Sequence, residues 1–243
     1  MMLRLLLGSG GYRTPERVAL LTREMRSFFG DIHQLLFVPY ALGDHDAYLN
    51  MVKERGLDAG YQIIGIHHTA NPRQAVENAE AIFIGGGNSF RLLDSLYQFD
   101  LIEVIRQRVQ AGMPYLGISA GTNVACPTIM TTNDMPIVMP PSLQALNLVP
   151  FQINPHYFNL PVYLKDGDNY LPHFGETRDE RIGEFHETND VPVVGLWEAG
   201  MIRIEGASAR LIGTGARLFR KGCEPIDLQP GADLSDLWQC SGV

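Results

Sequence analysis

The first half of the chain alternates short apolar runs with amphipathic segments whose apolar positions recur with the period of a helix. The apolar runs predict buried strands at residues 3–7, 34–38, 61–66, 81–84 and 114–118. The amphipathic segments predict helices at residues 15–29, 44–57, 72–79, 89–97 and 101–110; Thr14 and Pro15 are good capping residues for the first. Because strands and helices alternate with such short connections, we expect right-handed parallel crossovers. The predicted fold class is therefore α/β, a doubly wound, mostly parallel sheet flanked by helices.

The second half of the chain is less regular. Residues 131–161 are rich in Pro, Asn and Thr and predict long loops, interrupted by a short strand at 151–153. A helix is expected at 178–186, and strands at 191–196, 201–205, 209–212 and 217–220. With turns at 205–206 and 213–215, these strands are expected to be antiparallel and to extend one edge of the sheet. No linker-like composition break and no repeat is visible, so residues 1–243 are expected to form a single domain.

Composition narrows the class of protein. A hydrophobic content of 45% and a charged content of 19% are those of an ordinary globular protein. The formal net charge of −8, without a cluster of Lys and Arg, argues against nucleic-acid binding. No apolar stretch approaches the ~20 residues of a membrane span, and the apolar run at the start is too short for a signal peptide. Three cysteines, Cys126, Cys223 and Cys240, form no Cys-x-x-Cys pair and leave an odd count, so we expect a reducing, cytoplasmic location.

The strongest chemical signal lies at the end of the predicted strand 114–118. Gly117-Ile118-Ser119-Ala120-Gly121 matches the G-x-S-x-G pattern of a nucleophile elbow, in which a serine occupies a sharp strand-to-helix turn. The small residues leave room for strand and helix to approach closely, so that the hydroxyl of Ser119 projects outward. The alternative interpretation is a small-residue turn without chemistry.

A second glycine-rich segment follows the predicted strand 81–84. In Gly85-Gly86-Gly87-Asn88 the backbone N–H groups are exposed at a strand end. The segment lacks the Lys of a phosphate-binding loop, so nucleotide binding is disfavoured, although a simple tight turn stays open. Next to Ser119, the N–H of Gly86 or Gly87 is expected to form an oxyanion hole with that of Ala120.

A serine nucleophile needs a base and an acid that orients it. His156 ends a short strand closed by a proline, a rigid mount for a general base, whereas the adjacent pair His67-His68 is more typical of structural histidines. Two acids are candidates, Asp134 in a loop and Glu198 beyond an apolar strand, and each alone is more typical of a solvated surface carboxylate. We favour Glu198, because the end of a buried strand fixes a side chain better than a loop does.

Six motifs occur together in a specific order between about residues 80 and 200. The chain resembles peptidase family S51 in Gly85-Gly86-Gly87-Asn88, Gly117-Ile118-Ser119-Ala120-Gly121, Ala125-Cys126-Pro127-Thr128-Ile129, Thr131-Thr132-Asn133-Asp134-Met135-Pro136-Ile137-Val138, Ile153-Asn154-Pro155-His156 and Gly175-Glu176-Thr177-Arg178. The resemblance implies a fold related to class I glutamine amidotransferases and a serine peptidase that hydrolyses dipeptides beginning with aspartate. It implies Ser119 as nucleophile and His156 as base, and it leaves the acid open between Asp134 and Glu198.

Selection of an aspartyl substrate requires a cation near the nucleophile. Arg178 is the candidate, because a guanidinium binds a carboxylate bidentately, with Asn88 and His173 as further substrate-binding candidates. The alternative is that Arg178 pairs with Glu176 or Asp179 at a helix start. The loops between residues 130 and 170 are long enough to close the far side of a dipeptide site.

The sequence leaves two alternative functions open. One is a cyanophycinase-like or other S51 hydrolase acting on aspartyl polymers, and the other is a non-enzymatic binding module of the same fold. No metal or other cofactor is expected, because the histidines and acids lack His-x-x-x-His or similar spacing. The expected partners are a small dipeptide and, in a homodimer, a second copy of the chain. The tail after residue 222 is expected to cover a sheet edge or a partner surface.

Overall fold

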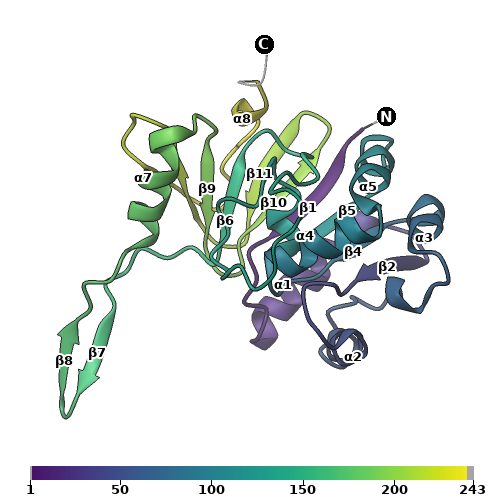
Figure 1. Ribbon diagram of the computed structural model, residues 1–243, viewed down its shortest axis with the longest axis horizontal. Coiled ribbons are helices and arrows are strands. Elements are labelled where there is room, and N and C mark those ends of the chain that lie inside the picture. Colours follow the sequence, from purple (N-terminus) through teal and green to yellow (C-terminus); the bar gives the residue numbers. More distant parts are fainter. Residues whose placement is uncertain (1, 240–243) are drawn as a thin grey trace.

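The computed structural model describes residues 2–239. A twisted seven-stranded sheet forms the centre of the molecule (Figure 1). Its strand order is β11-β10-β1-β5-β4-β2-β3, and β1, β5, β4, β2 and β3 are parallel. The strands span β1 (Arg4–Gly8), β2 (Gln34–Val38), β3 (Gln62–Gly65), β4 (Ile82–Ile84), β5 (Tyr115–Ile118), β10 (Met201–Glu205) and β11 (Ser208–Ile212). All five parallel strands were predicted within one residue at each end, and β10 and β11 form the predicted antiparallel extension beside β1.

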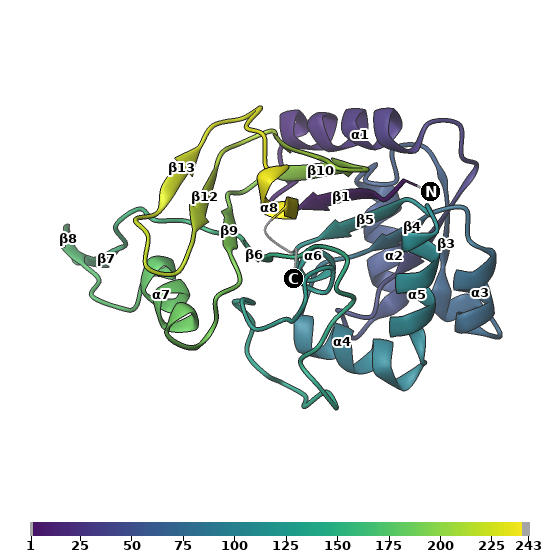
Figure 2. The same ribbon diagram turned by 90° about the horizontal axis from the view of Figure 1, so that it is seen from above.

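Helices cover both faces of this sheet, as expected for a doubly wound fold (Figure 2). They span α1 (Pro15–Phe29), α2 (His45–Glu54), α3 (Pro72–Asn78), α4 (Ser89–Gln98) and α5 (Leu101–Gln110). Alternate residues of β2 show the division, since Leu35 and Phe37 pack with α1 and α2 while Leu36 and Val38 pack with α3, α4 and α5. β2 is thus apolar on both sides, which is typical of a buried parallel strand. None of the helices within residues 2–239 is long and apolar enough to cross a membrane.

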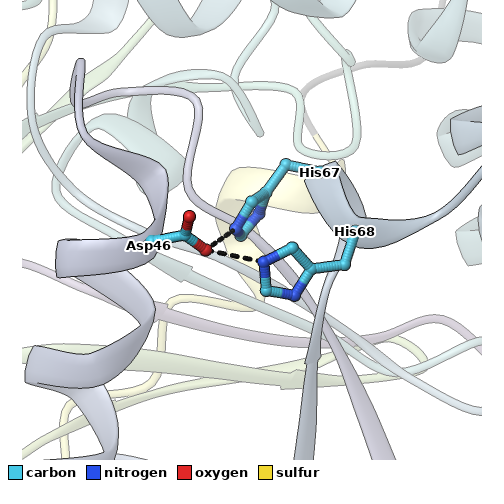
Figure 3. Close-up of side chains that lie close together, drawn as sticks. All are labelled: Asp46, His67 and His68. Atoms are coloured by element: carbon cyan, nitrogen blue, oxygen red, sulfur yellow. Dashed lines mark hydrogen bonds and ion pairs between the residues drawn. The ribbon is translucent and has the colours of Figure 1, made fainter.

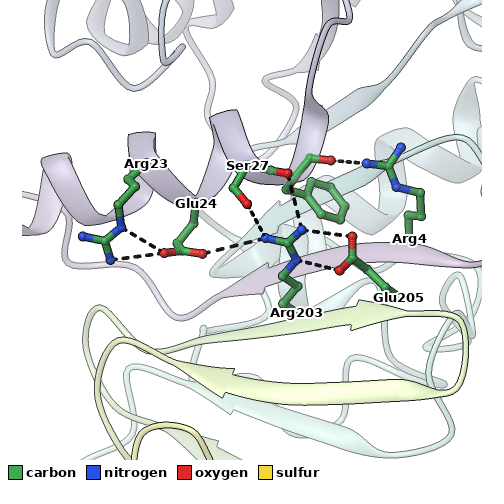
Figure 4. A network of polar contacts seen from close by, with 7 residues as sticks. Arg4, Arg23, Glu24, Ser27, Arg203 and Glu205 are labelled. Carbon is green, nitrogen blue, oxygen red and sulfur yellow. Dashed lines mark hydrogen bonds and ion pairs between the residues drawn. The ribbon is translucent and has the colours of Figure 1, made fainter.

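A polar network fastens the C-terminal half of α1 to the antiparallel side of the sheet (Figure 4). Arg203 of β10 binds both carboxylate oxygens of Glu205 at 3.0 Å and donates to the hydroxyl of Ser27 at 2.9 Å. Arg4 of β1 donates to the carbonyl of Phe28 on the same helix. Bidentate guanidinium contacts fix geometry, so this network sets where α1 lies against β1 and β10.

A second, four-stranded sheet lies beside the first (Figure 2) and corrects part of the predicted topology. Its order is β13-β12-β9-β6, with β6 (Gln152–Pro155), β9 (Val193–Leu196), β12 (Ala216–Phe219) and β13 (Ile226–Leu228). The strands predicted at 191–196 and 217–220 therefore do not extend the main sheet. They pair with each other and with β6, and α7 (Arg178–Thr188) packs on this sheet through Ile182. Pairing between distant segments is not encoded in local hydrophobic periodicity, which explains the error.

The remaining segments include one element that the sequence did not predict. The hairpin of β7 (Tyr163–Asp166) and β8 (Asn169–Pro172) projects from the body of the molecule (Figure 1), where loops had been expected to close over the site. The tail instead follows its prediction, because β13 pairs with β12 at a sheet edge and Leu237 of α8 (Asp236–Gln239) is buried in the main core. Cys240 lies outside the described residues, and the homodimer stays a prediction.

Candidate active site

Ser119 occupies a strained turn between β5 and the short helix α6 (Ala120–Asn123). Its φ of 55° and ψ of −110° lie outside the regions that non-glycine residues ordinarily adopt. The neighbouring glycines allow the turn, because a Cβ on Gly121 would lie 2.1 Å from the carbonyl oxygen of Ile84, and one on Gly117 would lie 2.5 Å from that of Gly121. The elbow geometry expected from the sequence is present.

Two adjacent parallel strands of the second sheet bring His156 and Glu198 to Ser119. His156 follows β6 and Glu198 lies two residues beyond β9, where Pro155 and Leu196 are paired in register. The Nε2 atom of His156 lies 2.9 Å from Oγ of Ser119, and its Nδ1 lies 2.7 Å from Oε1 of Glu198. The structure thus connects the three side chains in the order hydroxyl, imidazole and carboxylate.

Ser9, which the sequence reasoning did not single out, joins the strands that carry these groups. Its side chain is fully buried, donates to the carbonyl of Leu196 at 2.9 Å and accepts from the backbone N–H of His156 at 2.8 Å. Its own N–H donates to the carbonyl of Gly200 beyond Glu198. One hydroxyl at the end of β1 therefore fixes the strand ends of both β6 and β9.

Two glycines beside Ser9 leave the space that the imidazole and carboxylate occupy. A Cβ on Gly10 would lie 2.6 Å from the His156 ring, and one on Gly11 would lie 2.0 Å from Oε2 of Glu198. Both have positive φ, 130° and 73°, so both the space and the backbone require glycine. The run Gly8-Ser9-Gly10-Gly11 directly after the first strand was the signal available in the sequence.

Asp134, the other candidate acid, lies elsewhere, which corrects that alternative. Its Oδ2 accepts from the backbone N–H of Ser89 at 2.7 Å and from the hydroxyls of Ser89 and Thr132, at the start of α4. Within residues 2–239 it forms no hydrogen bond with His156. A carboxylate at a helix N-terminus is favourable, so Asp134 stabilises the start of α4.

Asn88 is similarly occupied. Its side-chain oxygen accepts from the N–H of Arg91 as the N-cap of α4, and its amide nitrogen donates to the carbonyl of Met135 at 2.9 Å. Both polar atoms already have partners, so the structure gives Asn88 a positioning role for α4 and the Met135 loop.

A cavity of about 200 Å³ opens beside Ser119 and His156. Gly86 and Gly87 line it, whereas Ala120 is buried at the first position of α6, where a helical N–H has no partner within its own helix. Apolar side chains line much of the wall, and they are Met51, Val52, Leu57, Phe83 and Ile118.

Polar side chains complete the wall, and those missed by the sequence reasoning include Arg13, Tyr48 and Arg55. Arg13 and Arg55 line the cavity, both exposed, and neither side chain forms an ion pair or hydrogen bond within the described chain. Burial raises the pKa of Tyr48 to about 12, so its hydroxyl remains protonated at neutral pH. No motif marked these three residues, since they come from segments that the fold alone brings to Ser119.

The predicted substrate-binding residues Arg178 and His173 do not line this cavity. His173 is exposed directly after β8, on the projecting hairpin, which corrects the expectation that it faces the pocket. Arg178 begins α7, half-buried, with its guanidinium carbon 5.5 Å from the centre of the Phe158 ring. Burial and then Arg181 lower the pKa of Arg178, whereas Asp134 opposes this shift.

The arrangement of a strand-end serine, a histidine and a glutamate on an α/β fold is that of a serine hydrolase. The sequence model of peptidase family S51 matches residues 4–212, and the chain belongs to this family. Peptidase E of Streptomyces coelicolor is 51% identical over 210 residues, covering 86% of this chain and 84% of that protein. A probable alpha-aspartyl dipeptidase of Drosophila melanogaster is 47% identical over 211 residues, covering 86% and 85%.

Solved structures share the fold at lower identity. A putative peptidase E protein from Listeria monocytogenes aligns with a TM-score of 0.61 at 21% identity, covering 94% of this chain and 99% of that one. A peptidase from an acI-B1 Actinobacterium aligns with a TM-score of 0.65 at 16% identity, covering 96% and 97%. The expected relation to class I glutamine amidotransferases stays a prediction.

The two candidate acids can be separated by comparing Glu198→Gln with Asp134→Asn. The first change should lower kcat by up to ~10⁴-fold, because the imidazole loses the carboxylate that orients it. The second should mainly lower the free energy of unfolding, by about 1 kcal/mol, because it weakens the cap of α4. Steady-state kinetics and urea unfolding of both variants measure this, and a larger kcat loss for Asp134→Asn would reverse the assignment.

Proposed function

We propose that the protein hydrolyses dipeptides with an N-terminal aspartate, through an acyl-enzyme on Ser119. The observation that carries this proposal is the hydrogen-bonded series of Ser119, His156 and Glu198 at the cavity. The names of the relatives, peptidase E and probable alpha-aspartyl dipeptidase, support the substrate class. Cys126 and Cys223 are free cysteines, which is typical of proteins in a reducing compartment and supports a cytoplasmic location.

In the proposed cycle, His156 accepts the proton of Ser119 as Oγ attacks the peptide carbonyl. Glu198 stabilises the imidazolium that forms, and its 2.7 Å contact with Nδ1 leaves Nε2 directed at the serine. His156 then protonates the leaving amine. A water molecule then attacks the acyl-enzyme, with His156 accepting its proton. Aspartate is released, and Ser119 regains its proton from His156.

The negative charge on the carbonyl oxygen needs donors in fixed positions. The backbone N–H of Ala120 at the start of α6, with that of Gly86 or Gly87, would provide them. A Cβ on Gly86 would lie only 3.0 Å from Cβ of Ser119, so this backbone passes close to the nucleophile, which supports the assignment.

Arg178 is the proposed partner of the substrate's aspartate side chain. Its Nε is buried without a hydrogen-bond partner within the described residues, which leaves donor capacity for a carboxylate. A desolvated guanidinium binds a carboxylate more strongly than an exposed one does. The alternative pairing at the helix start is not formed, since Glu176 pairs with Arg181 and Asp179 pairs with Arg217.

The cavity beside Ser119 would receive the leaving residue. Its apolar wall fits a side chain, and the free guanidinium groups of Arg13 and Arg55 at its rim fit the terminal carboxylate of a dipeptide. A dipeptide presents a free terminal carboxylate next to its leaving side chain, whereas the interior of a polymer does not, so the two arginines, unpaired within the described residues, favour a dipeptide over an aspartyl polymer. The complete Ser–His–Glu series disfavours a non-enzymatic binding module.

The substrate proposal is tested with a panel of Asp-Leu, Glu-Leu, Asn-Leu and N-acetylated Asp-Leu. We expect hydrolysis of Asp-Leu, little of the others, and at least a ~10³-fold loss of kcat in Ser119→Ala with unchanged circular dichroism. Retained activity in that variant, or equal rates on Asp-Leu and Asn-Leu, would refute the proposal.

The role of Arg178 is tested with Arg178→Met. Loss of a bidentate pair to a desolvated carboxylate should cost roughly 2 to 5 kcal/mol in kcat/KM for Asp-Leu, and far less for Asn-Leu. Arg181→Met is the matched control, because Arg181 is a neighbouring arginine already paired with Glu176. Proportional losses on both substrates would mean that Arg178 only supports the fold.

The role of the two rim arginines is tested with a substrate that lacks the terminal charge. Wild-type protein should prefer Asp-Leu to Asp-Leu amide by roughly 10- to 100-fold in kcat/KM, as expected for a hydrogen bond to a charged group. Arg13→Met with Arg55→Met should abolish this preference, whereas the exposed Arg23→Met on α1 should keep it. If the wild type does not distinguish the amide, the arginines do not bind the carboxylate.

A further inference from the structure

Three side chains from two separate elements meet at a point that the proposed peptidase chemistry does not use (Figure 3). Asp46 lies in the first turn of α2, and His67 and His68 lie in the 3₁₀ helix η1 (Ile66–His68) directly after β3. Both imidazoles direct Nε2 at the same carboxylate oxygen of Asp46, at 3.1 Å from His67 and 2.6 Å from His68. All three potential ligand atoms lie within 4.8 Å of one another.

We propose that Asp46, His67 and His68 form a binding site for a divalent first-row transition metal ion, with Zn²⁺ as the reference case. Two neutral imidazole nitrogens and one carboxylate oxygen are ligands that this class of ion prefers, and a water can complete the four positions of Zn²⁺. The sequence reasoning did not identify the site because adjacent histidines lack helical ligand spacing and the carboxylate comes from a distant segment.

The distances from Asp46 to the two histidines can be compared with those of a tetrahedral site, and the two imidazole nitrogens lie within 4.8 Å of each other. Metal–ligand distances of about 2.1 Å place neighbouring ligand atoms about 3.4 Å apart. Oδ1 of Asp46 lies 3.1 Å from Nε2 of His67, so these two atoms are almost at the required distance. It lies 2.6 Å from Nε2 of His68, and this distance must increase by about 0.8 Å. The Asp46 and His68 side chains are 70% and 53% exposed, so rotation can supply this change and an ion can enter from solvent.

The His67 ring is held in position by its neighbours. Its side chain is only 11% exposed, and its ring packs between those of His45 and His68, with centroids at 5.4 and 4.1 Å. A Cβ on Gly65 would lie 2.3 Å from the His67 ring, so glycine is needed for the ring to occupy this position. A ligand held by packing loses little conformational entropy on binding a metal.

A bound ion would tie the first turn of α2 to the end of β3. The same helix carries Tyr48 of the Ser119 cavity, and Arg55 follows it directly. The ion would therefore brace α2 beside the site and would take no part in the chemistry at Ser119. The competing account, a carboxylate that merely pairs with two histidines, predicts no saturable metal binding.

The test is a calorimetric titration of metal-free protein with Zn²⁺ in the His156→Gln background, which removes the histidine of the Ser119 site as a competing ligand. We expect one ion per chain. His68→Asn and Asp46→Asn should each weaken binding at least ~10-fold, since even loss of a residue that only orients a ligand costs this much. His33→Asn, which changes an exposed histidine elsewhere, should bind as the parent does.

His68 and Asp46 are exposed, so these variants should remain folded, and circular dichroism verifies this. Co²⁺ provides a second readout, because its visible absorption should change in the parent protein and not in His68→Asn. The proposal is wrong if the parent shows no saturable binding below ~100 μM. It is also wrong if the folded His68→Asn and Asp46→Asn variants bind as tightly as the parent.

Discussion

The buried hydroxyl of Ser9 is the contact on which the arrangement of the site depends. The main sheet supplies Ser119 at the end of β5, whereas the second sheet supplies His156 and Glu198 at the ends of β6 and β9. A hydrogen-bonded imidazole tolerates displacements of only a fraction of an ångström, so the two sheets must be held in fixed register. Ser9 provides this by bonding to the backbone beside both His156 and Glu198, from a position with no solvent exposure.

The site concentrates unfavourable backbone geometry where chemistry is expected. Ser119, His156 and Ala199 all have positive φ, between 55° and 63°, which costs about 1 to 3 kcal/mol each in residues with a side chain. Buried hydrogen bonds oppose this cost, including those from Ser119 N–H to Gly8 and from Ala199 N–H to Gly10. The glycines at the end of β1 therefore have two roles. They leave room for the imidazole and the carboxylate, and their carbonyl groups accept hydrogen bonds from the strained turns.

Local signals made the first half of the fold predictable from sequence. Both ends of α1 were predicted correctly, and its start was marked by the capping Thr14 with Pro15; in the structure the helix ends before Gly30, whose φ is 66°. The elbow at Ser119 was readable because its small residues are contiguous. The pairing of β9 and β12 into a second sheet could not be predicted from the sequence, because strand partners depend on contacts between distant segments. The residues of the cavity wall were missed for the same reason, because only the folded chain brings Arg13 and Arg55 beside Ser119.

The central claim is that His156 and Glu198 activate Ser119, and covalent labelling tests it most directly. A fluorophosphonate reacts with a serine only where a base removes its proton and an oxyanion site stabilises the adduct. Native protein should take up one equivalent, located at Ser119 by peptide mass mapping, while heat-unfolded protein takes up none and Glu198→Gln reacts far more slowly. Unlabelled native protein, or an adduct on a different residue, would contradict the account.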